Sequence, residues 1–424
     1  MRNLLWIDEF IRSIKNYIFL RKEDNVMIII PNQVYSLNKT GFKVLEFLFS
    51  GGKIRDIEKF IDDKKKEELF YFFCDLRAIL TGCLKENEKR KTINYLEYSE
   101  DFFRYPVISE VAVNYRCNLN CKFCYAGSQN KDKGLSTKDI KKILKKIRYQ
   151  AKVPFVSFTG GEPLLRKDIF ELISFAQKID LKTNLITNGT LITVEVAEKL
   201  KRAGLESAQV SLEGPEKVHN EITGVRGAFE KTIRGIKELK EKGIRVHTNT
   251  TLNKMNIPYV FELIDIIKSI GLDKFSMNLL IPCGSAYKNK DIWVKYSEIG
   301  EVIKKVKNYS NKKGLKFIWY SPLPFCIFNP VKEGLGGKGC AALKGLLSVD
   351  PEGNIIPCSS FFEPVGNLLK EDFEKIWFSE KAQFYRKREF AGEKCKKCEL
   401  FEKCTGACVL YFRKIGYEEI KRRI

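Results

Sequence analysis

Three cysteines in one short segment carry the clearest chemistry of this sequence. Cys117, Cys121 and Cys124 follow an apolar, β-like run with the spacing Cys-x3-Cys-x2-Cys. Three thiolates on one loop can bind three irons of a [4Fe–4S] cluster and leave the fourth iron open to a substrate or cofactor. A structural zinc site would need a fourth Cys or His nearby, and this segment has none. We therefore predict an iron–sulfur cluster at this loop.

A second set of cysteines with ordered spacing lies in the last hundred residues. Cys340 and Cys358 flank a predicted hairpin around Gly353, and a quartet with the spacing Cys-x2-Cys-x5-Cys-x3-Cys follows. A lone Cys-x2-Cys indicates zinc about as well as iron, so this spacing by itself leaves the metal open. The quartet consists of Cys395, Cys398, Cys404 and Cys408.

The elements that must position the first three cysteines form an alternating pattern. Between residues 105 and 290, six apolar β-like runs alternate with helical patterns such as 136–148 and 228–241. This alternation predicts an α/β fold, a partial (β/α)6 TIM-like barrel. Chemistry in such barrels takes place at the carboxyl ends of the strands. Two polar motifs lie at such ends, at residues 159–163 and 211–214.

The chain divides into three predicted domains. Residues 1–104 combine short β-like runs with helical patterns, which predicts a winged-helix-like module. Residues 105–290 form the barrel. Residues 291–424 turn irregular and rich in glycine and cysteine, which predicts an iron–sulfur domain.

The cysteine triad and the motifs after the strands resemble the signature of radical S-adenosylmethionine (SAM) enzymes. The resemblance implies that the Gly-Gly-Glu motif contacts the amino group of SAM. It also implies that a serine at the end of the fourth strand contacts the SAM carboxylate, and that the backbone of an aromatic residue meets adenine. These residues are Gly160, Gly161 and Glu162, then Ser211, then Phe123.

The same resemblance implies the reaction. The reduced cluster would pass one electron to SAM, which splits into methionine and a 5′-deoxyadenosyl radical, and this radical would abstract hydrogen from a substrate carbon. Many relatives carry an Arg where Thr223 stands, and Arg226 is the nearest candidate cation for the SAM carboxylate. Only two histidines occur, and no side chain is identifiable as a general base, so we assign no catalytic acid or base.

The C-terminal cysteines resemble the SPASM extension of radical SAM enzymes, which carries auxiliary [4Fe–4S] clusters. The family's usual last cysteine is missing after Cys408. The second cluster therefore has an open iron, takes Glu418 or Glu419 as a ligand, or does not form. The resemblance implies two ligand sets: Cys340, Cys358, Cys408 and the candidate Cys326 for one cluster, and Cys395, Cys398 and Cys404 for the other.

The first hundred residues resemble, less specifically, the peptide-binding modules related to the carrier of the pyrroloquinoline quinone pathway. In those modules a leader peptide adds a strand to a winged-helix-like sheet, and the matching segment here is 34–37, before a predicted helix. Strand addition needs no basic patch, and residues 1–104 carry 19 basic and 17 acidic side chains. A DNA-binding winged helix normally carries more positive charge.

These features lead to one leading hypothesis, a radical SAM maturase that modifies a ribosomally made peptide or protein. The product would be a thioether, a carbon–carbon link or a related modification. The expected cofactors are SAM, its [4Fe–4S] cluster and one or two auxiliary clusters. The expected partners are a precursor peptide with an acidic leader and a reductant such as flavodoxin or ferredoxin.

Two other functions compete with this hypothesis. A radical SAM enzyme could act instead on a small molecule such as a tetrapyrrole side chain. The net charge of +22 lies almost entirely beyond residue 104 and favours acidic partners, which raises a nucleic-acid-binding or RNA-modifying protein as the other alternative. We rank nucleic acid as the less favoured partner.

The sequence predicts a cytoplasmic protein. No apolar run reaches the roughly 18 residues of a membrane span. The first residues include acidic side chains and lack the small-residue cleavage site of a secretory signal. In a reducing compartment, the 13 cysteines serve as ligands more readily than as disulfides.

Overall fold

The N-terminal module is an antiparallel sheet packed on helices. The computed structural model describes residues 3–82, 92–96, 104–127 and 134–421. The four strands follow the order β1-β2-β3-β4. The elements are α1 (Trp6–Ile14), η1 (Lys15–Tyr17), β1 (Ile18–Arg21), β2 (Val26–Ile29), β3 (Gln33–Leu37), α2 (Lys39–Phe49), α3 (Ile54–Glu58), α4 (Asp63–Leu80) and β4 (Ile93–Leu96).

Local sequence explains where the longer helices of this module begin. The Asn38 side chain caps α2 by accepting the backbone N–H of Gly41, and Asp62 caps α4 in the same way. Leu45 of α2 and Phe73 of α4 are fully buried in a hydrophobic core that is separate from the core of the barrel. The module therefore has its own apolar interior.

Six parallel strands form the barrel, as the alternating pattern predicted. Each strand pairs with its neighbour in sequence, from β5 to β10. The barrel elements are β5 (Ile108–Asn114), α5 (Thr137–Tyr149), β6 (Phe155–Gly160), η2 (Pro163–Leu165), α6 (Ile169–Lys178), β7 (Lys182–Thr187), α7 (Val194–Arg202), β8 (Ser207–Ser211), α8 (Glu216–Thr223), α9 (Ala228–Glu241), β9 (Arg245–Leu252), η3 (Ile257–Tyr259), α10 (Val260–Ser269) and β10 (Lys274–Leu279).

The sheet extends beyond the six strands that we predicted. β11 pairs in parallel with β10, and β12 pairs in parallel with β5 at the other side. The predicted hairpin around Gly353 is β12 and β13. Residues beyond 290 thus share the barrel's sheet and its hydrophobic core. The elements are η4 (Gly284–Lys288), η5 (Lys290–Ile292), α11 (Tyr296–Lys312), β11 (Lys316–Trp319), β12 (Leu346–Val349), β13 (Asn354–Ile356) and β14 (Gly366–Asn367).

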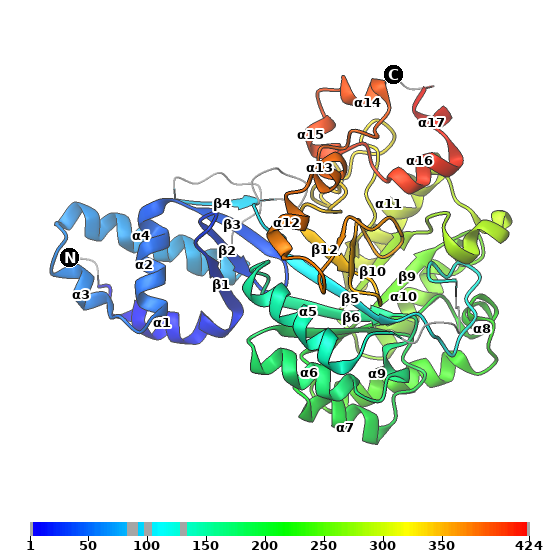
Figure 1. Ribbon diagram of the computed structural model, residues 1–424, viewed down its shortest axis with the longest axis horizontal. Helices are drawn as coiled ribbons and strands as arrows, with labels where there is room; N and C mark the ends of the chain where they lie inside the picture. Colours follow the sequence, from blue (N-terminus) through cyan, green and yellow to red (C-terminus); the bar gives the residue numbers. More distant parts are fainter. Residues whose placement is uncertain (1–2, 83–91, 97–103, 128–133, 422–424) are drawn as a thin grey trace.

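Short helices and irregular segments complete the C-terminal region, which Figure 1 shows in orange and red beside one end of the barrel. Among the described helices, none combines the length and the apolar character that crossing a membrane requires. The last helices are α12 (Phe373–Trp377), α13 (Glu380–Arg386), α14 (Glu393–Lys396), α15 (Phe401–Cys404), α16 (Val409–Ile415) and α17 (Glu418–Lys421).

The strand edge that we expected to receive a leader peptide already has a partner. β4 pairs antiparallel with β3, with Val34 opposite Leu96 and Tyr35 opposite Tyr95. The two tyrosine rings meet edge to face, with centroids 5.5 Å apart. A strand from this chain therefore occupies the edge of residues 34–37.

A buried arginine connects the N-terminal module to the start of the barrel. Arg21, at the end of β1, is 1% exposed and pairs with the Asp24 carboxylate through Nε and Nη2, at 2.8 and 2.9 Å. Its guanidinium also donates to the backbone carbonyls of Tyr105 and Pro106, just before β5. One planar cation thus satisfies a carboxylate and two carbonyls of the junction.

Replacing this arginine should destabilise the protein. We expect Arg21→Met to lower the free energy of unfolding by about 3 kcal/mol or more, because Asp24 would stay buried without its cation. The matched control is Arg12→Met on the exposed side of α1, which should change stability by about 0.5 kcal/mol at most. Denaturant titration of both variants measures the difference, and equal effects would refute the role of Arg21.

Candidate functional site

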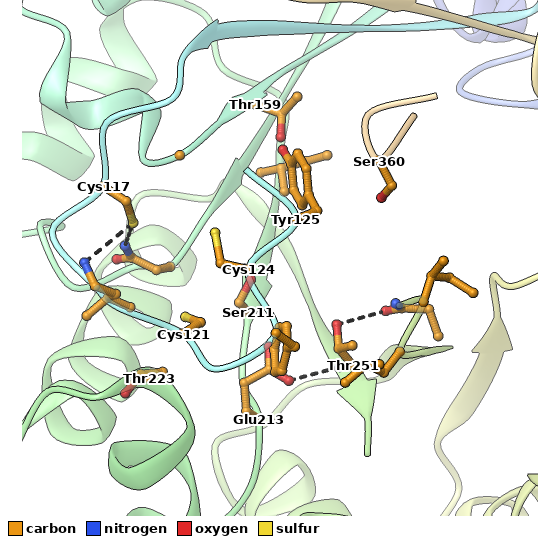
Figure 2. Close-up of a pocket in the computed structure, with 18 of the residues that line it drawn as sticks. Cys117, Cys121, Cys124, Tyr125, Thr159, Ser211, Glu213, Thr223, Thr251 and Ser360 are labelled. Atoms are coloured by element: carbon orange, nitrogen blue, oxygen red, sulfur yellow. Dashed lines mark hydrogen bonds between the residues drawn. The ribbon is translucent and has the colours of Figure 1, made fainter. Parts of the chain in front are cut away.

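A cavity of about 190 Å³ lies at the carboxyl ends of the barrel strands. Figure 2 shows the thiols of Cys117, Cys121 and Cys124 around a common space, with Ser211 and Glu213 beside them. The described lining contains no lysine or arginine. It includes four of the residues predicted to contact SAM: Phe123, Gly160, Gly161 and Ser211.

The three thiols fit the predicted cluster. Burial raises the pKa of Cys117 to about 11 and that of Cys121 well above its usual value, and charge on the neighbouring thiols raises both further. Buried thiols with such raised pKa values lose their protons together only when they bind a positively charged metal centre. Three thiols that line one cavity suit a [4Fe–4S] cluster, in which each would bind one iron and the fourth iron would stay open.

Two N–H groups form hydrogen bonds with the sulfur of Cys117. The backbone N–H of Leu119 lies 3.4 Å from Cys117 Sγ, and the Asn188 side-chain amide lies 3.8 Å from the same atom. Hydrogen bonds to the sulfur stabilise a thiolate and tune the potential of a cluster that it binds.

The Gly-Gly-Glu motif after β6 holds the start of the cysteine loop. Gly161 N–H donates to the Asn114 carbonyl at 2.9 Å, and Glu162 N–H donates to the Arg116 carbonyl at 2.8 Å. A Cβ on Gly160 would lie 1.9 Å from the Asn114 oxygen, and one on Gly161 would lie 2.1 Å from the Arg116 oxygen. Glycine is thus required here by the approach of the protein's own backbone.

Two other segments hold the rest of the loop. The C-terminal end of α8 accepts backbone N–H groups from Asn120 and Lys122. After β10, Ser285 N–H donates to the Cys124 carbonyl at 2.8 Å. A Cβ on Gly284 would lie 2.2 Å from that carbonyl oxygen, so glycine is again needed for the close approach.

Glu162 is placed differently from our expectation. It is fully buried, it is not among the lining residues, and its carboxylate accepts hydrogen bonds from Leu164 N–H, Thr187 Oγ1 and Asn188 N–H at 2.8 to 3.1 Å. Burial raises its pKa to about 7. In this arrangement Glu162 joins the ends of β6 and β7.

A second acidic residue does line the cavity. Glu213, two residues after β8, is 3% exposed and accepts the Thr251 N–H at 2.9 Å, as the dashed line in Figure 2 shows. Burial raises its pKa to about 8. Glu213 was not among the predicted site residues, although it stands in the polar motif 211–214 at the end of the fourth barrel strand.

His219 of α8 is a buried residue that also lines this cavity. Its Nδ1 accepts the Glu213 backbone N–H at 3.1 Å, and burial lowers its pKa to about 4. The ring is therefore neutral with its hydrogen on Nε2, and Nε2 has no hydrogen-bond partner among the described residues. Arg226, by contrast, is exposed and does not line the cavity, so the structure does not bring this predicted residue to the site.

Other lining residues were not among the predicted site residues. Tyr125 directly follows Cys124 on the cysteine loop and donates its hydroxyl to the Gly160 carbonyl at 2.8 Å. Cys283, after β10, lines the cavity together with Ser360 from the C-terminal region. Only folding brings Cys283 and Ser360 to the cysteine loop, because both are distant from it in the sequence.

The structure places three cysteines of the first auxiliary set, Cys340, Cys358 and Cys408, near one another. Burial raises the pKa of Cys358, and charge on Cys340 and on Cys408 acts in the same direction; burial also raises the pKa of Cys408 to about 12. Cys340 N–H also donates to Thr405 Oγ1 at 2.7 Å. This hydrogen bond holds Cys340 beside the segment that leads to Cys408.

Cys326 corrects our assignment of ligands. We expected it beside Cys340, but the structure places it in a second cavity, of about 40 Å³, with the other auxiliary cysteines. Its charge raises the pKa of Cys395, which burial brings to about 11. Glu419, a candidate replacement ligand, instead accepts hydrogen bonds from Tyr411 and Ser297. The cysteines that line this cavity are Cys326, Cys395, Cys398 and Cys404.

Comparisons with known proteins agree with this geometry. The family described as the radical SAM superfamily matches residues 111–267, and the SPASM iron–sulfur cluster-binding domain matches residues 340–399. An AdoMet-dependent heme synthase of Oleidesulfovibrio alaskensis is 30% identical over 311 residues, which cover 68% of this chain and 79% of that relative. A PqqA peptide cyclase of Bradyrhizobium diazoefficiens is 28% identical, with 72% of this chain and 82% of the relative covered.

One solved structure matches nearly the whole chain. SuiB of Streptococcus suis, bound to its precursor peptide SuiA, has a TM-score of 0.72 at 20% identity. The match covers 94% of this chain and 96% of that one. These findings confirm the predicted partial barrel and the C-terminal iron–sulfur domain.

A single methyl group should disrupt the cysteine loop. We expect Gly161→Ala to lose about four irons per chain after anaerobic reconstitution, because the new Cβ would displace the Arg116 carbonyl and with it Cys117. The matched control is Gly392→Ala, where the nearest atom to a Cβ is 3.4 Å away. Iron and sulfide analysis of both variants tests this, and full iron content in Gly161→Ala would contradict it.

Glu162 offers a test of structure against cofactor binding. We expect Glu162→Gln to lower the free energy of unfolding by about 1 to 3 kcal/mol without SAM, because the amide NH2 cannot accept the N–H donors around it. Glu171→Gln, on the exposed side of α6, is the control. Unchanged stability combined with weaker SAM binding would instead support the ammonium contact that the family resemblance implies.

Proposed function

Because this chain belongs to the radical SAM superfamily, we propose that it is a maturase that modifies a ribosomally made peptide. SAM and its [4Fe–4S] cluster supply the 5′-deoxyadenosyl radical that abstracts a substrate hydrogen. The cavity formed by the cysteine loop and the strand ends is the site of this chemistry. A flavodoxin or ferredoxin would deliver the electron.

The chain's own residues have three tasks in this proposal. Cys117, Cys121 and Cys124 hold the cluster. The Ser211 hydroxyl and the His219 Nε2–H bind the SAM carboxylate, because the lining offers no cation for it. The apolar lining limits water around the reacting atoms, which protects a radical from side reactions.

The presence of the N-terminal module is the observation that best supports a peptide substrate. The comparison with SuiB leaves only about 6% of this chain unmatched, so it includes most of this module of roughly one hundred residues. SuiB was crystallised with its precursor peptide, and PqqA peptide cyclase is a further relative. A module with its own core and a sheet that ends in two outer strands suits recognition of a leader by strand addition.

The docking edge differs from the one first expected. Since β4 covers β3, a leader strand would pair with one of the two outer strands of the sheet, β1 or β4, or displace β4. The net charge of +22 favours an acidic leader through long-range attraction. A cytoplasmic location, where precursor peptides are made, belongs to the same proposal.

A small-molecule substrate is the second candidate. The observation that favours it is the 30% identity to a heme synthase, which exceeds the identity to the peptide cyclase. The heme synthase match covers 68% of this chain, less than the match to SuiB. We therefore rank a tetrapyrrole substrate below a peptide.

Two assays separate these candidates. After anaerobic reconstitution and reduction, we expect the wild-type protein to release 5′-deoxyadenosine from SAM and the Cys117/Cys121/Cys124→Ala triple variant to release none. With short peptides encoded beside its gene, mass spectrometry should show loss of two hydrogens for a cross-link, or uptake of solvent deuterium for an epimer. Conversion of an added iron tetrapyrrole, with peptides unchanged, would favour the second candidate. Absence of 5′-deoxyadenosine from the wild type would refute both.

A further inference from the structure

The second auxiliary site contains four thiols from two distant parts of the chain. Cys395 and Cys398 lie on and just after α14, Cys404 ends α15, and Cys326 lies on the irregular segment after β11. The four side chains line one cavity of about 40 Å³. The SPASM match begins at residue 340, so it does not include Cys326.

A backbone contact fixes Cys326 near the other three cysteines. The N–H of Phe325 donates to Cys404 Sγ, with nitrogen and sulfur 3.4 Å apart. The residue next to Cys326 is thereby held directly against the third cysteine of the set. Such N–H donors stabilise a ligating thiolate.

Apolar side chains line the rest of this site. Phe325, Leu400, Phe401 and Ile420 are among them; Cys395 is buried, whereas Cys326 and Leu400 are exposed. Among apolar side chains an uncompensated thiolate is disfavoured. Four thiols gathered in this way therefore suit a positively charged centre that they bind as thiolates.

Four cysteines can hold either a zinc ion or a [4Fe–4S] cluster. The family model that matches residues 340–399 describes an iron–sulfur cluster-binding domain, and Cys395 and Cys398 lie within this match. The match favours a [4Fe–4S] core at this site.

We propose that Cys326 is the fourth ligand of a closed [4Fe–4S] cluster with Cys395, Cys398 and Cys404. It fills the fourth ligand position from a segment that precedes the other three cysteines in the sequence. The site then needs neither an open iron nor a carboxylate ligand. This assignment concerns the cluster alone and does not depend on which substrate the protein modifies.

The experiment uses the Cys117/Cys121/Cys124→Ala chain, in which only auxiliary clusters remain. This chain should bind about eight irons. Adding Cys326→Ala should either remove about four irons or produce the electron paramagnetic resonance signal of an oxidised [3Fe–4S] cluster. Cys74→Ala, in α4 of the N-terminal module, is the matched control and should leave iron content and spectra unchanged.

A second variant keeps the test decisive if Cys326→Ala fails to fold. Cys326→Ser retains an oxygen ligand, so it should keep the irons and shift the signal of the reduced cluster. Full iron content with unchanged spectra in both Cys326 variants would overturn the assignment. Zinc in place of about four irons in the parent chain would overturn the proposed cluster.

Discussion

The loop that carries Cys117, Cys121 and Cys124 has no regular secondary structure, and backbone hydrogen bonds from three other segments hold it in place. These segments follow β6, end α8 and follow β10, so they come from well-separated parts of the barrel. Glycines permit two of the contacts, because a side chain at Gly161 or Gly284 would collide with a carbonyl oxygen of the loop. The three thiols therefore converge only when most of the barrel has folded, and the Arg116 and Cys124 carbonyls of the loop gain backbone partners in the process.

The same sheet fixes the C-terminal region relative to the cavity. Glu110 of β5 lies opposite Ser348 of β12 and accepts its hydroxyl. The same carboxylate oxygen accepts both the N–H and the hydroxyl of Ser359, in the turn after Cys358. The next residue, Ser360, lines the cavity. One carboxylate on the first barrel strand thus joins the turn of the first auxiliary set to the wall of the site, and a single hydrophobic core runs beneath both.

Sequence patterns predicted those features of the structure that depend on residues close together in the chain. The apolar periodicity of residues 228–241 gave the bounds of α9, and the short spacings of the triad and the quartet identified the thiols that share a loop or adjacent turns. The position of Cys326 depends on how an irregular segment crosses a domain, and no periodicity encodes that path. The hydrogen bonds of Glu162 could not be predicted from the sequence for a similar reason. A sequence shows a carboxylate, but the donors that surround it come from the end of another strand.

The two auxiliary sites differ in a way that divides their work. With Cys326 assigned to the second site, four cysteines would coordinate all four irons of its cluster. The other lining residues are apolar, and none of the described lining residues belongs to the SAM cavity. A closed cluster in such a place can pass electrons but cannot bind substrate. The first site lies near the cavity: charge on Cys283, which lines the cavity, raises the pKa of Cys408, and the backbone of Ser360 forms a hydrogen bond with Cys358. Contact between an auxiliary cluster and a substrate in the cavity would therefore have to occur at the first site.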